Sequence, residues 1–127
     1  MNIKDNRPKF LNLLKIRLPI TGIASICHRL SGLVLFLAIP FSLYLLQLSL
    51  TDSSSFSKML DYLTAPIVKL GLIILTWSFI HHLFAGFRFL LIDQNIGITL
   101  SAARKTALYV VVLTILATFI IIGVWVV

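Results

Sequence analysis

The stretch LSGLVLFLAIPFSLYLLQLSLT, residues 30–51, carries no charged side chain and decides the class of the fold. Two further uncharged runs occupy residues 70–87 and 106–127. Each run has about 18 to 22 residues, enough or nearly enough for a helix to cross a hydrocarbon layer about 30 Å thick. Because lipid offers no partner to backbone N–H and C=O groups, each run is expected to be helical. The sequence predicts an all-α integral membrane protein with three transmembrane helices.

The composition excludes a soluble domain. Hydrophobic residues make up 59% of the 127 residues and charged residues only 12%, about half the charged fraction of a typical soluble domain. We expect one domain over residues 1–127, with helices at about 20–50, 66–93 and 105–127. The polar segments 51–57 and 94–105 are expected to be the two connections. The N-terminal segment 1–18 is basic and partly amphipathic, which suits the headgroup layer of a membrane.

The net charge of +7 follows the expected membrane topology and does not indicate a nucleic-acid partner. Basic side chains precede the first apolar run and flank the second connection, whereas the first connection carries both signs. The basic residues of these two groups are Lys4, Arg7, Lys9, Lys15, Arg17, Arg29, Arg88, Arg104 and Lys105, and the first connection carries Lys58 and Lys69 beside Asp52 and Asp61. The positive-inside rule then predicts a cytoplasmic N-terminus and a C-terminus on the opposite side.

The N-terminal segment is not expected to be a signal peptide. Its basic region and its apolar run are both too long, and no small-residue cleavage site follows. The single cysteine, Cys27, excludes an internal disulfide and a cysteine-ligated cluster within this sequence. We expect Cys27 to pack as a small apolar side chain.

Two adjacent histidines, His81 and His82, interrupt the second uncharged run. Polar side chains at that depth are usually functional, but adjacent helix positions point about 100° apart and serve different partners. His82 shares a helix stripe with Gly86 and Phe89, and a flat macrocycle could approach the backbone at Gly86. His82 is therefore a candidate haem ligand through Nε2. The alternative is a histidine that hydrogen-bonds a neighbouring helix.

A second polar group stands at the start of the first helix, in SICHRLSG at residues 25–32. Ser25 and Arg29 are four residues apart and share a helix face. They could donate hydrogen bonds to a quinone carbonyl, while His28 and Arg29 could offset haem propionates. The alternatives are a topology-setting role for Arg29 and helix packing for Ser25 and Gly32. His28 is expected nearer the membrane surface than His82, so a second axial histidine is expected from another chain.

The whole chain resembles the cytochrome b556 membrane-anchor family of bacterial succinate dehydrogenases. IRLPITGIASICHRLSG at residues 16–32 matches the family's N-terminal signature, and HHLFAGFRFLLID at residues 81–93 resembles its second-helix H-x-x-x-G-x-R-x-x-x-x-D pattern. Some relatives carry a histidine where this chain has Phe89, so one contact at the haem rim is expected to differ.

The resemblance implies a role for each matching residue. His82 takes the position of an axial ligand of haem b, Ser25 and Arg29 take ubiquinone-site positions, and His28 and Arg29 lie near the haem propionates. It also implies a bacterial inner-membrane location and three partners: a second anchor subunit, an iron–sulfur subunit and a flavoprotein subunit. The chain alone would not oxidise succinate. The competing hypotheses are a haem-free anchor of a related complex such as fumarate reductase, and a small transporter subunit with a polar path through His81 and Arg88.

Overall fold

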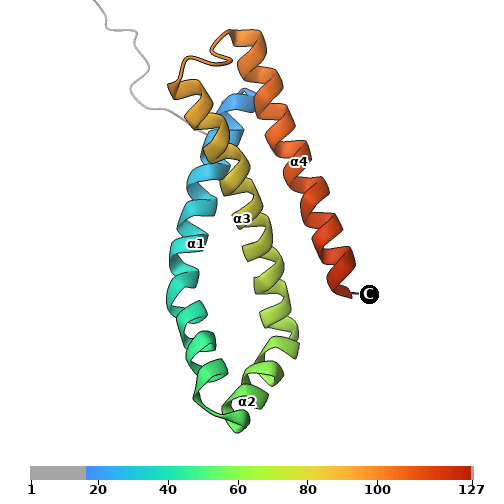
Figure 1. Cartoon of the computed structure of the whole chain (residues 1–127). Helices are drawn as coiled ribbons and strands as arrows, with labels where there is room; N and C mark the ends of the chain where they lie inside the picture. The colour runs from blue at the N-terminus through green and yellow to red at the C-terminus, as the bar shows by residue number, and fades with distance from the viewer. Residues whose placement is uncertain (1–16, 127) are drawn as a thin grey trace, which may run out of the picture.

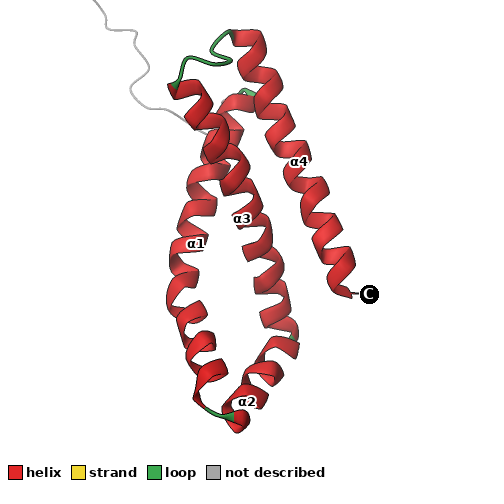
Figure 2. Cartoon of the chain, in the orientation of Figure 1, coloured by secondary structure: helices red, strands yellow, loops and turns green. Residues whose placement is uncertain are grey.

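The computed structural model describes residues 17–126, with side chains as far as residue 124. This part of the chain forms four helices, namely α1 (Ile20–Thr51), α2 (Ser53–Thr64), α3 (Pro66–Asp93) and α4 (Leu100–Val126). Every regular element in it is helical (Figure 2). Helices α1 and α3 run side by side in opposite directions, and α4 packs against both (Figure 1). The all-α prediction is confirmed for the described residues, and helices α1, α3 and α4 are long and apolar enough to cross a membrane.

The described core is thin and is made largely of small side chains. Ala24, Ala85 and Ala107 are almost fully buried where helices meet, and small residues allow such close backbone approach in membrane proteins. Most large apolar side chains point outward, as Phe36, Phe87 and Phe119 do. Apolar surface of this extent is costly in water, at about 25 cal/mol per Å². The lateral surface therefore suits lipid or another membrane chain.

Helix α1 contains the run that decides the fold, and its bounds agree with the prediction of residues 20–50. Pro40 lies inside this helix, which remains continuous to Thr51. Helix α3 also has the predicted bounds. Pro66 occupies its first turn, where a backbone N–H has no partner within the helix, so the missing N–H of proline loses no hydrogen bond. The amphipathic arm predicted for residues 1–18 falls almost entirely outside the described residues.

The first connection contains a helix that we did not predict. We expected a polar loop at residues 51–57, but α2 begins at Ser53. The Asp52 carboxylate caps it, accepting hydrogen bonds from the Ser55 backbone N–H at 2.8 Å and the Ser55 hydroxyl at 3.0 Å. A capping side chain of this kind satisfies N–H groups that the first turn leaves free. The loop prediction was therefore wrong, and α2 closes the end of the molecule where α1 passes to α3 (Figure 1).

The second connection is shorter than predicted. Asn95 adopts a left-handed conformation with φ 59°, and the Ile96 N–H bonds the Leu91 carbonyl at 2.9 Å, which ends α3. Helix α4 then begins at Leu100 rather than at residue 105. Thr99 starts it, because its hydroxyl accepts from the Ala102 N–H at 3.3 Å. Residues 94–99 thus form the whole connection.

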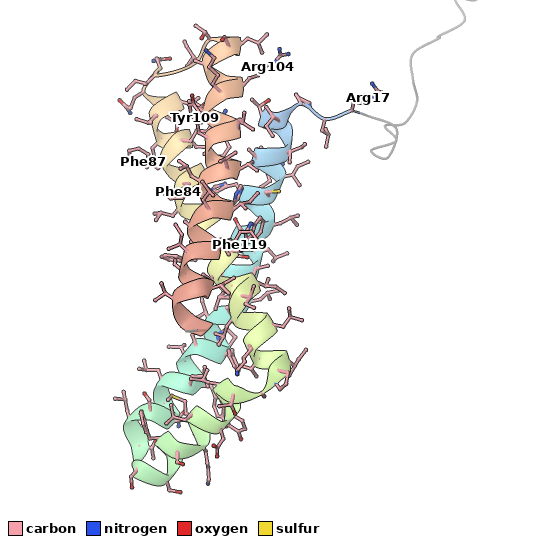
Figure 3. All side chains as sticks on the ribbon, turned by 90° about the vertical axis from the view of Figure 1, so that its right-hand side faces the viewer. Arg17, Phe84, Phe87, Arg104, Tyr109 and Phe119 are labelled. Carbon is pink, nitrogen blue, oxygen red and sulfur yellow. The ribbon has the colours of Figure 1, made fainter. Side chains whose placement is uncertain are left out.

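The charged residues separate between the two ends of the bundle. Arg17 and Arg104 lie at the same end, where α1 begins and the α3–α4 connection lies (Figure 3). Asp52, Lys58 and Asp61 belong to the opposite end, in and beside α2. Ser25 and Arg29 lie near the start of α1 and therefore near this basic end of the bundle.

Candidate functional site

The imidazole of His82 on α3 contacts the backbone of α1. Its Nδ1 lies 3.2 Å from the His28 carbonyl oxygen and 3.3 Å from the Ser31 hydroxyl oxygen. A carbonyl oxygen only accepts, so this contact is satisfied when Nδ1 carries the proton. In that tautomer the lone pair of the neutral ring is on Nε2. His82 is half-buried, so this ring stands at the margin of the helix contact and not in its centre.

Gly32 on α1 lets this ring approach. A methyl group at Gly32 would lie 3.0 Å from Cε1 of His82 and 3.3 Å from its Nδ1. Contacts of that length are tighter than a side-chain carbon normally makes, so the ring would have to shift by a few tenths of an ångström. The interpretation of Gly32 as a site of close helix packing is confirmed, and the neighbour that requires it is His82.

His28 lies beside His82, which corrects one expectation. We expected His28 nearer the membrane surface, but the two rings stack with centroids 4.2 Å apart and an interplanar angle of 16°. His28 is eight residues, about 12 Å, into α1, and His82 is at a similar depth before the end of α3. Rings stacked face to face cannot present nitrogens to opposite sides of one metal ion. His28 is therefore not placed to be the second axial ligand of a metal at His82.

The Nε2 atom of His28 is buried and has no hydrogen-bond partner among the described residues. It faces Gly86, where a methyl group would lie 3.6 Å away. Phe89 packs against the same ring, with centroids 5.2 Å apart. The predicted stripe of His82, Gly86 and Phe89 is therefore present, but within this chain Gly86 and Phe89 contact His28. A buried polar nitrogen without a partner is costly, so His28 is a position where an external acceptor or donor would be stabilised.

His81 is fully enclosed, with 2% of its surface exposed. Its Nε2 lies 3.5 Å from the Ala24 carbonyl oxygen and its Nδ1 lies 3.4 Å from the Thr114 hydroxyl oxygen. Trp77 stacks on the ring with centroids 5.2 Å apart. Both ring nitrogens thus face oxygens of neighbouring helices, and His81 joins α3 to α1 and α4. Neither nitrogen is available to a metal in this arrangement.

Arg88 also serves the contact between helices. Only 7% of it is exposed, and its Nε donates to the Thr106 hydroxyl at 3.1 Å while Nη2 donates to the Ala103 carbonyl at 3.1 Å. His81, Ala85 and Arg88 thus form one buried stripe on α3. The two residues considered for a transporter's polar path therefore bond to α1 and α4 oxygens.

Ser25 and Arg29 stand on α1 one turn apart, as predicted. Ser25 is half-buried and Arg29 is exposed. Among the described side chains, no hydrogen bond or ion pair joins either residue to the His28–His82 pair. The structure thus places these two polar groups one turn apart on α1, near the end of the bundle that carries the basic residues.

The described cavities lie away from these residues. One cavity of about 660 Å³ is formed by α1, α3 and α4 and is lined by apolar side chains such as Leu35, Phe79 and Ala117. Neither His82 nor Ser25 or Arg29 lines it. This cavity is therefore separate from the polar residues singled out above.

Two polar residues at these contacts were not singled out from the sequence. Ser31 is fully buried and bonds the His28 carbonyl at 2.8 Å, and Thr114 is 1% exposed and contacts His81. Ser31 lies between His28 and Gly32, which the sequence did identify. Its position three residues after His28 was the available signal, because that spacing puts both on one helix face.

Comparison with known proteins identifies the family of this chain. The family model of the succinate dehydrogenase/fumarate reductase transmembrane subunit matches residues 3–122. The succinate dehydrogenase cytochrome b556 subunit of Coxiella burnetii is 36% identical over 127 residues, with 99% of each chain covered. The proteins of that name from Rickettsia felis and Paracoccus denitrificans are 32% and 33% identical, over 91% and 82% of this chain and 90% and 80% of their own. This chain therefore belongs to the family of succinate dehydrogenase cytochrome b556 subunits, within the succinate dehydrogenase/fumarate reductase transmembrane subunits.

Proposed function

We propose that this membrane subunit binds haem b together with a second anchor subunit and forms part of a ubiquinone reduction site in succinate dehydrogenase. The observation that carries the proposal is the hydrogen bond from Nδ1 of His82 to the His28 carbonyl. Metal-ligating histidines usually donate their second ring N–H to a carbonyl, carboxylate or water, which fixes the tautomer and orients the ring. His82 already has this arrangement, with Nε2 left to bind iron. When bound, haem b supplies a one-electron redox centre.

The residues around His82 fit a haem in three respects. Its ring is half-buried and reachable from outside the bundle. The buried Nε2 of His28 lacks a partner among the described residues and could donate to a propionate carboxylate. Arg29, next to it in the sequence and exposed, could offset the propionate charge. These observations support His82 as the axial ligand and His28 and Arg29 as propionate contacts.

A second chain must complete the haem site. His28 stacks on His82, and His81 directs both ring nitrogens at helix oxygens. Neither is positioned to bind iron opposite His82. We infer that the second axial histidine comes from a partner anchor subunit that packs on the apolar lateral surface. An iron–sulfur subunit and a flavoprotein subunit complete the enzyme and carry the oxidation of succinate.

Ser25 and Arg29 are proposed to bind ubiquinone. Ser25 and Arg29 are four residues apart and therefore share one face of α1. They lie near the end of the bundle where Arg17 and Arg104 stand (Figure 3). Donors held at that position can orient a quinone carbonyl and stabilise the negative charge that develops on its oxygen during reduction. The role of this chain is to hold and polarise the quinone while electrons arrive from the iron–sulfur subunit.

The orientation follows from the distribution of charge. Arg17 and Arg104 share the end of the molecule where α1 begins (Figure 3), and clustered basic residues remain on the cytoplasmic side. We propose that this end, with the N-terminus, faces the cytoplasm of a bacterium and that α4 ends toward the opposite side of the inner membrane.

The visible spectrum of the complex purified with this chain tests the haem proposal. We expect a reduced b-type absorption that His82→Ala abolishes and His81→Ala retains, since His81 joins helices and does not reach a metal. The chains that co-purify identify the partner subunits. Loss of the absorption in His81→Ala, with retention in His82→Ala, would reverse the assignment. A wild-type complex with all its subunits and no haem absorption would support a haem-free anchor instead.

A further inference from the structure

Ser31 is a second residue of α1 that contacts the His82 ring, and the function proposed above does not use it. It is fully buried, with 0% of its surface exposed. Its Oγ lies 2.8 Å from the His28 carbonyl oxygen and 3.3 Å from Nδ1 of His82. The serine hydroxyl thus stands between the backbone of α1 and the imidazole carried by α3.

The hydrogen-bond roles at this contact follow from the number of protons available. The Ser31 hydroxyl has one proton, and the 2.8 Å contact directs it to the His28 carbonyl. The oxygen atom that faces His82 therefore offers a lone pair. The N–H on Nδ1 of His82 accordingly has two acceptors, the Ser31 oxygen at 3.3 Å and the His28 carbonyl at 3.2 Å.

Close packing at Gly32 restricts the same ring. A methyl group at Gly32 would lie 3.0 Å from Cε1 of His82, so there is no free space for a side chain between the α1 backbone and the ring edge. Nδ1 of His82 has two acceptors, and the adjacent ring carbon faces Gly32 with no room for a side chain between them. The imidazole therefore has little freedom to turn about its χ2 angle. Residues 28, 31 and 32 of α1 therefore define the orientation of a side chain on α3.

We propose that Ser31 is a positioning residue for the axial ligand of the haem. It holds His82 in the Nδ1–H tautomer, fixes the plane of the ring, and increases the electron donation of Nε2 by accepting from Nδ1–H. This inference rests on the proposed function, because it requires iron at His82. Outer hydrogen bonds of this kind raise the basicity of a histidine ligand and tune the metal that it binds.

Removal of the Ser31 hydroxyl should therefore change the haem and not only the stability of the protein. Without the Ser31 hydroxyl, the Nδ1–H of His82 has one hydrogen-bond acceptor in place of two. Nε2 would then donate less charge to ferric iron, and the oxidised haem would lose part of its stabilisation. We expect the ratio of oxidised to reduced haem at a given potential to fall about threefold to tenfold. That range corresponds to a rise in midpoint potential of about 28 to 59 mV for a one-electron couple.

The experiment uses the intact complex purified from membranes and compares the wild type with Ser31→Ala and Ser31→Cys. Cysteine has nearly the size of serine, but its thiol is a weak hydrogen-bonding group, so it preserves packing if alanine prevents assembly. Thr118→Val is the matched control. Thr118 is 7% exposed, and among the described residues its hydroxyl donates only to the Thr114 carbonyl of its own helix. Redox titration gives the midpoint potential, and the EPR spectrum of the oxidised haem reports the orientation of the ligand planes.

The proposal predicts a raised potential and a shifted EPR signal in both Ser31 variants, with wild-type values in Thr118→Val. A haem-loaded Ser31→Cys complex with wild-type potential and EPR signal would overturn the role of Ser31 and leave His82 as the ligand. A potential raised equally in Thr118→Val would also overturn it, since the effect would then be a general consequence of losing a buried hydroxyl. A wild-type complex without b-type absorption would overturn both this inference and the haem proposal on which it rests.

Discussion

Nδ1 of His82 lies 3.2 Å from the carbonyl oxygen of His28, so the backbone of α1 directly holds an imidazole carried by α3. The two residues are 54 positions apart in the sequence, and their rings stack with centroids 4.2 Å apart. One contact thus couples the packing of two membrane helices to the orientation of the proposed haem ligand. A change on α1 is expected to affect the haem even where it does not touch iron.

The first prediction concerns the closest packing at this contact. Gly32→Ala should reduce the haem content of the purified complex, because the new methyl group would lie 3.0 Å from Cε1 of His82 and displace the ring. Overpacking of this kind usually costs about 1–3 kcal/mol of stability. The haem-to-protein ratio and the thermal midpoint of the complex measure the effect.

Gly71→Ala is the matched control for this prediction. A methyl group at Gly71 on α3 would meet nothing within 4 Å among the described residues, and alanine favours a helix by about 0.8–1 kcal/mol over glycine. Haem content should stay at the wild-type level in this variant. Equal loss of haem in both variants would contradict the proposed contact between Gly32 and His82.

The second prediction separates quinone binding from assembly. Arg29→Ala should lower the rate of quinone reduction about 10-fold to 100-fold, since a hydrogen bond to a charged group contributes about 1.5–3 kcal/mol. Succinate oxidation with an artificial dye should continue at the wild-type rate, because that reaction does not need the membrane quinone site. Lys69→Ala, which removes a positive charge near the opposite end of α3, should leave both rates unchanged. Parallel loss of both rates in Arg29→Ala would indicate failed assembly and contradict the quinone role.

The third prediction tests the role of Arg88. Thr106→Val removes the hydroxyl that accepts from Nε of Arg88 at 3.1 Å and leaves a buried donor without this partner. Stability should fall by about 1–3 kcal/mol, measured by thermal unfolding of the complex in detergent, while the haem spectrum stays the same. Thr51→Val provides the comparison, because the exposed Thr51 hydroxyl bonds only the Gln47 carbonyl of its own helix. Equal destabilisation in the two variants would exclude a special role for the bond to Arg88.

The fourth prediction concerns pH and the start of α2. Hydrogen bonds from the backbone N–H and hydroxyl of Ser55 lower the pKa of the Asp52 carboxyl below its ordinary value. A carboxyl with a lowered folded-state pKa stabilises the fold above its unfolded pKa, and that contribution is lost as the pH falls through the folded pKa. The Ser55 amide should therefore exchange with solvent faster in Asp52→Ala than in wild type near pH 7. The difference should disappear below both pKa values, and a difference that persisted there would contradict the charged cap.

Much of the fold was predictable because hydrophobic length and charge act locally along the sequence. The uncharged runs at 30–51 and 70–87 determine where α1 and α3 lie, and Pro66 fixes the first turn of α3. Helix α2 was missed because its serines suggest a loop. Asp52 as a capping residue and the helical spacing of Phe56, Met59, Leu60 and Leu63 were the signals that could have predicted it.

The candidate site was predictable in its residue types but not in its contacts. The position of His82 before Gly86 suggests it as the candidate ligand. The stack of His28 on His82 depends on how far α1 and α3 are offset along their axes. The spacing of residues within one helix does not predict the axial offset between two helices. The same reason explains Ser31 and Thr114, whose importance appears only when the facing helix brings a histidine against them.

The most direct test of the central claim is a structure of the intact complex with its cofactors, determined from membranes that contain the partner subunits. We predict iron bonded to Nε2 of His82, with Nδ1 of the same ring on the His28 carbonyl and a histidine of another chain on the opposite face of the haem. A haem iron bonded to two residues outside this chain, or a His82 ring that faces only lipid, would contradict the account.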